Sequence, residues 1–123
     1  MKAVIASITI LLSLSGCADS GVICDEKSSE VSFARSIGKE RLAKVFEDVK
    51  VLKSEGKILS GGLVPAQFSD LKIKTIRVHT NVHLRLKGCF DHHIDLVVYD
   101  GEEQKIELRW GEHKPGKEVL WKK

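Results

Sequence analysis

Aromatic side chains are scarce in this chain, and no long stretch of it carries charge of one sign. Among its 123 residues are two Trp, one Tyr and four Phe, and 20 basic residues are nearly balanced by 17 acidic ones. A nucleic-acid-binding protein needs a basic stripe or a platform of stacking aromatics. The composition therefore argues against a nucleic-acid partner. Internal repeats and low-complexity segments are also lacking in the sequence, which indicates one small domain.

A hydrophobic run long enough to cross a membrane is also lacking. The apolar stretch at the start covers residues 3–12, whereas a transmembrane helix needs about 20 apolar residues. Lys2 precedes this stretch, and the small residues Ser15 and Gly16 follow it. A basic start, a short apolar core and small residues at a cleavage point are typical of a secretory signal. The sequence thus predicts a signal peptide over residues 1–16.

The four residues Leu14-Ser15-Gly16-Cys17 resemble the lipobox of bacterial lipoproteins. This resemblance implies that Cys17 receives a diacylglycerol, becomes the first residue of the mature protein and is then N-acylated. In lipoproteins generally, an aspartate directly after the cysteine retains the protein in the inner membrane, and here Ala18 stands in that place. The resemblance therefore implies a lipid anchor on the periplasmic face of the outer membrane. The alternative is an ordinary cleaved signal in which the cysteine occurs by chance.

Once Cys17 is assigned to lipid, Cys24 and Cys89 remain as a pair. In an oxidising compartment such a pair favours a disulfide, which contributes about 4 kcal/mol on the chain-entropy model. Two free buried thiols are the alternative. Residues 17–28 are small and polar and are expected to form the lipidated tether, while residues 29–123 are expected to form one domain.

The spacing of apolar residues changes along the expected domain. Over residues 29–55 they recur at intervals of three and four, which predicts an amphipathic helix that Gly38 is able to kink or divide. From residue 74 the interval becomes two, and Asp100-Gly101 marks a turn. The pattern predicts an α+β fold, with one N-terminal amphipathic helix packed on a three- to four-stranded antiparallel meander sheet.

Polar residues alternate with the apolar ones in the predicted strands, and many of them are basic. The residues expected to bind a protein partner are Arg77, His79, His83, Arg85, Lys87 and Arg109. A basic patch of this kind steers and orients an acidic partner. Asp95 and Glu107 interrupt the patch, so cross-strand ion pairs are the alternative explanation for the same residues.

Histidines on this face suggest a second candidate site. His79, His83, His93 and Asp95 carry imidazole and carboxylate groups, which are ligands that suit Zn²⁺. Residues four apart on a strand lie about 13 Å from each other, so one ion cannot bind His79 and His83 on a straight strand. We therefore expect no metal and no cofactor. A metal- or anion-binding module that uses this face stays as the alternative function.

Catalytic arrangements are not apparent in the sequence. Ser, His and Asp are present, but no Gly-x-Ser-x-Gly elbow positions a nucleophile. The adjacent carboxylates Glu102-Glu103 and Asp25-Glu26 lie in segments that resemble a turn and a tether, where nothing distinguishes an acid from a base. We expect no enzyme, and a small hydrolase is the least favoured function. The expected function is a lipid-anchored protein-binding module of the cell envelope, of the inhibitor, immunity or envelope-assembly type.

Substitution of the expected lipid acceptor tests the anchor directly. Cys17→Ala should abolish incorporation of labelled fatty acid, because no thiol remains to accept the diacylglycerol. The variant should also stay uncleaved or leave the membrane fraction. Undiminished labelling of Cys17→Ala would contradict the lipoprotein assignment.

Overall fold

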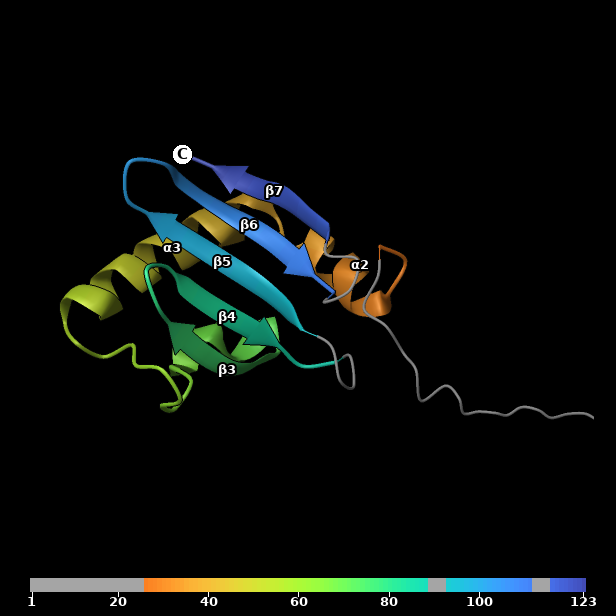
Figure 1. Ribbon diagram of the computed structural model, residues 1–123. Coiled ribbons are helices and arrows are strands. Elements are labelled where there is room, and N and C mark those ends of the chain that lie inside the picture. Colours follow the sequence, from red (N-terminus) through yellow and green to blue (C-terminus); the bar gives the residue numbers. More distant parts are fainter. Residues whose placement is uncertain (1–25, 89–92, 112–115) are drawn as a thin grey trace, which may run out of the picture.

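The structure is a computed structural model that describes residues 26–88, 93–111 and 116–123. Two α-helices and a short 3-10 helix precede five strands within these residues (Figure 1). The elements are α2 (Ser29–Ser36), α3 (Lys39–Ser54), η2 (Ala66–Leu71), β3 (Ile73–Val78), β4 (Val82–Leu86), β5 (Ile94–Asp100), β6 (Gln104–Trp110) and β7 (Gly116–Lys122). This arrangement confirms the α+β class. No helix in the described ranges has the length and apolar character that a membrane crossing requires.

The strands form one antiparallel sheet in the order β3-β4-β5-β6-β7, so each strand pairs with its neighbour in the chain. The prediction of three to four strands is wrong, because the sheet has five. The apolar run that begins near residue 74 is divided into β3 and β4 by a tight turn. In this turn the backbone N–H of His79 donates to the carbonyl oxygen of Asn81 at 3.0 Å.

The prediction of one N-terminal helix is wrong, whereas the division of the helical run over residues 29–55 at Gly38, which the sequence allowed, is confirmed. Helix α2 ends at Ser36, and both Ile37 (ψ 120°) and Gly38 (ψ 159°) have extended backbones before α3 begins at Lys39. The side chain of Ile37 is half-buried and packs against the core. Two extended residues redirect the chain, so the two helices have different axes in Figure 1.

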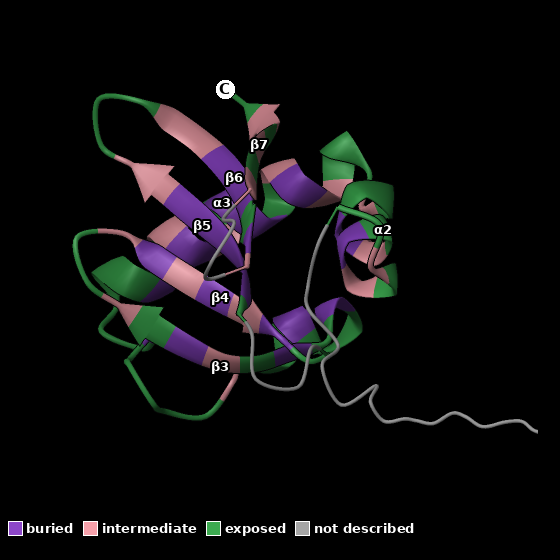
Figure 2. Ribbon diagram, turned by 45° about the vertical axis from the view of Figure 1, so that its right-hand side comes forward, coloured by how far each residue is buried: buried purple, intermediate pink, exposed green. Residues whose placement is uncertain are grey.

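The core lies between α3 and one face of the sheet (Figures 1 and 2). Helix α3 buries one apolar face, and alternate residues of the strands meet it. The fully buried side chains include Leu42, Val45, Phe46, Val49, Leu84, Leu96, Ile106 and Leu108. The ring of Trp121 in β7 packs on Phe46, with the ring centroids 5.0 Å apart. The period of two predicted for the strands therefore identifies the side chains that face the helix.

A cross-strand contact of Trp110 depends on a glycine. Gly116 in β7 pairs with Trp110 in β6, and a Cβ at residue 116 would lie 2.3 Å from the indole Cε2. The indole is nearly buried, with the Arg35 guanidinium 5.6 Å from its ring centroid. An added methyl group must therefore displace a packed ring.

We expect Gly116→Ala to lower the free energy of unfolding by about 1–3 kcal/mol, the usual cost of overpacking. Gly101→Ala is the matched control, because a Cβ at residue 101 meets nothing within 4 Å. The control should change the free energy by no more than about 0.5 kcal/mol. Urea denaturation of both variants measures the difference, and equal midpoints would contradict the role of this contact.

Candidate functional site

The helices cover one face of the sheet, and no described helix covers the other, which faces the viewer in Figure 1. We call this surface the open face. Strand partners point to the same side of a sheet, so the register defines which side chains share it. Two rows cross all five strands, and a third crosses the last three. These rows are Thr75-Arg85-Asp95-Arg109-Lys117, Arg77-His83-Val97-Glu107-Val119 and Tyr99-Lys105-Lys122.

Asp95 lies near the centre of the open face and is nearly buried. The neighbouring strand supplies Arg85, whose Nε and Nη2 donate to the two carboxylate oxygens at 3.0 and 3.4 Å. His83 lies two residues earlier on the same strand, with its Nδ1 3.7 Å from Oδ2 of Asp95. A bidentate contact of this kind fixes the relative orientation of the arginine and the carboxylate and places opposite charges together. Asp95 is thus compensated from within the sheet.

Glu107 is the second buried carboxylate, with 5% of its surface exposed. Arg109 Nε donates to its Oε1 at 2.6 Å, and the Tyr99 hydroxyl donates to the same oxygen at 3.2 Å. Lys105 Nζ lies 3.7 Å from the other oxygen. Arg109 also donates through Nη2 to the hydroxyl of Tyr99, which closes a three-residue network. Three polar neighbours therefore hold a single carboxylate.

Val97 is fully buried although it lies on the open face. Its strand partners are His83 and Glu107, and it alternates with Leu96 and Val98 of the core. No described helix lies above it, and its strand partners on this face have long polar side chains. Charged residues often bury apolar surface with their aliphatic stems in this way. The centre of the open face is therefore a packed layer of polar side chains.

The surroundings shift the pKa values of two side chains in this layer, Glu107 and His83. Burial raises the pKa of Glu107, but the opposing effects of Arg109, Tyr99 and Lys105 outweigh burial and hold the pKa below its ordinary value. Burial lowers the pKa of His83, and Asp95 opposes this effect only in part. Burial therefore favours the neutral form of His83, and Arg85 supplies the positive charge beside Asp95.

The structure brings together most of the residues predicted to bind a partner. Arg77, His83, Arg85 and Arg109 lie on the open face, and the His79 ring meets His83 edge-on with centroids 6.0 Å apart. Lys87 does not follow the same pattern. It lies beyond the end of β4, where its backbone N–H donates to the carbonyl oxygen of Lys72, and it lines two surface hollows near η2.

Sequence reasoning did not select Tyr99 and Lys117 for this site. Their places follow from the pairing of β5, β6 and β7. The turn at residues 100–101 was a usable signal, because a short hairpin places Tyr99 directly opposite Lys105. Lys117 had no such signal, because its place opposite Arg109 depends on a strand that the sequence pattern left uncertain.

The four residues of the alternative metal site do not converge. His83 pairs with Val97, whereas His93 lies four residues earlier than Val97, about 13 Å along the strand. His83 and Asp95 meet, and His79 contacts His83 through its ring edge. Among the residues that the structure describes, no three metal-ligating side chains are grouped so that they could hold an ion.

The predicted lipidation and disulfide residues Cys17, Cys24 and Cys89 lie outside the described residues. The disulfide stays a prediction.

Comparisons with protein-family models, curated proteins and solved structures gave no match to this chain. The argument for function therefore rests on the site itself.

Replacement of the buried carboxylate tests the network of the open face. Glu107→Gln should lower the free energy of unfolding at pH 7 by about 1–3 kcal/mol, because Arg109 loses its charged partner. The depressed pKa means that ionised Glu107 stabilises the fold above its ordinary pKa of 4.5. This contribution disappears as pH falls through the lower pKa of the folded state. The difference between wild type and variant should therefore shrink between pH 5 and pH 3.

Glu103→Gln is the matched control, since Glu103 contacts the same lysine at 3.1 Å with a side chain 60% exposed. An exposed ion pair contributes little, so this variant should change the free energy of unfolding by less than about 1 kcal/mol. Urea denaturation across the pH series compares the two variants. Equal effects, or a difference for Glu107→Gln that is independent of pH, would rule out the proposed network.

Proposed function

We propose that this chain is a small lipid-anchored lipoprotein of the cell envelope that binds an acidic protein partner through its open face and carries out no catalysis. The observation that carries this proposal is the uncovered sheet face, whose basic side chains outnumber its two carboxylates. The predicted lipobox supports the anchor through Cys17, on the periplasmic face of the outer membrane. An inhibitor, an immunity protein or an assembly accessory fits this description.

The charge balance of the open face favours an anionic partner. Asp95 and Glu107 are occupied by Arg85 and by Arg109 with Lys105, so both carboxylates are already compensated. Arg77, Lys117 and Lys122 form no ion pair with another described residue, and they extend from one edge strand to the other. The excess of positive charge gives a field that accelerates association with an acidic surface and orients it.

The same geometry disfavours acid–base catalysis. A general acid needs a pKa raised toward neutrality, and the pKa of Glu107 is shifted in the opposite direction by its donors. The Asp95 carboxylate accepts hydrogen bonds from both Nε and Nη2 of Arg85. Both carboxylates therefore organise the cations around them, and the surface they form is suited to recognition.

Site-specific photo-crosslinking in cells tests which surface meets the partner. A photoreactive amino acid is placed at Val119 on the open face, or at Val51 on α3 as a matched control. The two positions are 48% and 51% exposed. We expect a discrete adduct with an acidic envelope protein from Val119 and none from Val51. Absence of an adduct from Val119, or equal adducts from both positions, would contradict the proposal.

Charge reversal then tests the electrostatic part of the proposal. Arg77→Glu combined with Lys117→Glu should abolish the Val119 adduct and reduce affinity for the identified partner at least about tenfold, with the loss greatest at low salt. Lys39→Glu with Lys57→Glu changes net charge equally on the helical side and should leave binding intact. Because all four side chains are exposed, thermal unfolding should be nearly unchanged. Equal losses in the two double variants would exclude a specific role for the open face.

A further inference from the structure

The chain between α3 and η2 lies beside the outer edge of β3 and borders the sheet on that side (Figures 1 and 2). The Val78 N–H of β3 donates to the Ser60 hydroxyl at 2.8 Å. The Gly61 N–H donates in turn to the carbonyl oxygen of Ile76 at 2.9 Å. These two bonds fix the loop of residues 59–63, which we call the leucine loop, against a strand of the sheet.

Two leucine side chains project from this loop into solvent. Leu63 is 95% exposed and Leu59 is 62% exposed, the two largest values among the large apolar side chains of the described residues. Between them the Gly62 N–H donates to the carbonyl oxygen of Leu59 at 3.1 Å and closes a tight turn. Single exposed leucines are common on protein surfaces, whereas two leucines on one fixed turn form an apolar projection that indicates contact with another molecule.

The segment that carries the leucine loop also carries the excess positive charge of the described chain. Residues 56–88 contain six basic residues and one acidic residue, whereas the other described residues contain twelve of each sign. The single acidic residue, Asp70, is already compensated, because Arg41 of α3 donates to its two carboxylate oxygens at 2.9 and 2.8 Å. An anionic surface would therefore be attracted to this part of the molecule more than to the rest.

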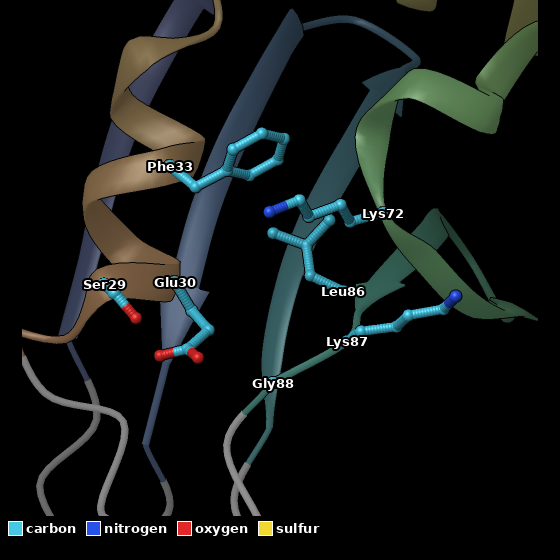
Figure 3. Close-up of a pocket in the computed structure, with 7 residues that line it drawn as sticks. All are labelled: Ser29, Glu30, Phe33, Lys72, Leu86, Lys87 and Gly88. Carbon is cyan, nitrogen blue, oxygen red and sulfur yellow. The ribbon is translucent and has the colours of Figure 1, made fainter.

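The cations of this segment are spread over the surface and do not converge on one point. Arg77 and Arg85 lie on the open face. The other four are lysines with exposed side chains, namely Lys57, Lys72, Lys74 and Lys87. The amino groups of Lys72 and Lys87 point apart in Figure 3. A small anion needs donors that face one point, whereas a broad anionic lipid surface attracts charges that are spread over an area.

We propose that the β3 edge of the domain docks on the anionic phospholipid surface of the membrane that holds the lipid anchor, with Leu59 and Leu63 inserted between the lipid headgroups. Buried apolar area and the attraction of cations to anionic lipids together determine the strength of such interfacial binding. A fluid bilayer accommodates a protruding side chain without a preformed pocket. Because β7 forms the opposite edge of the sheet, this orientation leaves the open face accessible to a protein partner.

This inference rests on the lipid anchor of the proposed function. Eight residues separate Cys17 from Glu26, the first residue that the structure describes. A lipid at Cys17 would therefore hold the domain within about 30 Å of the bilayer surface. Tethering at this distance raises the effective concentration of the leucine loop at the membrane, so two apolar side chains and a few cations suffice for docking.

Tryptophan fluorescence tests the docking on the full-length protein, purified in detergent and reconstituted into vesicles of phosphatidylcholine and phosphatidylglycerol. Leu63→Trp is compared with Val119→Trp, a matched control on the opposite edge strand that is 48% exposed. Bromine atoms on the lipid acyl chains quench an indole ring that reaches them. After subtraction of the wild-type emission, we expect the signal of Leu63→Trp to fall at least about twofold in brominated vesicles and that of Val119→Trp to stay unchanged. Equal quenching in the two variants would overturn the proposal.

Charge reversal tests the contribution of the lysines. Lys57→Glu combined with Lys74→Glu should reduce the quenching of Leu63→Trp at least about twofold, and so should vesicles of phosphatidylcholine alone. Lys117→Glu with Lys122→Glu on β7 changes the net charge equally and should leave the quenching intact. All four side chains are exposed, so thermal unfolding should be nearly unchanged. Quenching that depends neither on the two lysines nor on phosphatidylglycerol would overturn the proposal.

Flotation of the vesicles separates this proposal from the anchor on which it rests. Wild-type protein that does not float with the vesicles would contradict the lipid anchor, and the docking with it. Flotation without quenching of Leu63→Trp would leave the anchor in place and overturn the docking alone. In cells, a photoreactive amino acid at Leu63 should label phospholipid. A discrete protein adduct from this position would overturn the proposal and assign the two leucines to a protein partner.

Discussion

The carboxyl groups of Glu107 and Asp95 are nearly buried on a sheet face with no described helix above it. A buried charge is costly unless it is paired and hydrogen-bonded, and here the partners come from the same sheet. Arg85 reaches Asp95 from β4, and Tyr99 reaches Glu107 from β5. These contacts require the observed register, because a slip of one residue would turn the carboxylates toward the core. The polar layer and the apolar core thus specify the same pairing of strands.

This pairing has a consequence for recognition. Because the two carboxylates are compensated internally, the remaining cations of the open face are available to a partner, and the layer that presents them is fixed by packing around Val97. A site on a rigid sheet loses less conformational freedom on binding than one on a loop.

The edges of the sheet are protected in different ways. Beside β3, Gly61 donates its N–H to the carbonyl oxygen of Ile76, and the Val78 N–H donates to the hydroxyl of Ser60. The chain between α3 and η2 therefore satisfies part of the β3 edge and leaves Leu63 exposed. At β7, Glu118 pairs with Arg35 of α2, and charged residues on an edge strand discourage pairing with another sheet.

The sequence by itself determined the α+β class, the apolar period of the strands and the abundance of basic residues on the opposite side, because these depend on local periodicity. It marked Gly38 as a point where the helical run can kink or divide, but it did not decide between the two, since the extended pair at Ile37 and Gly38 is favoured by the burial of Ile37 against the core. Tertiary structure alone decided which cations are compensated, because Arg85 and Asp95 meet through register. Lys87, which alternation had placed on the open face, lies beyond the end of β4 and lines the hollows near η2. Periodicity describes one strand at a time, whereas charge compensation and grooves arise between elements that are distant in the sequence.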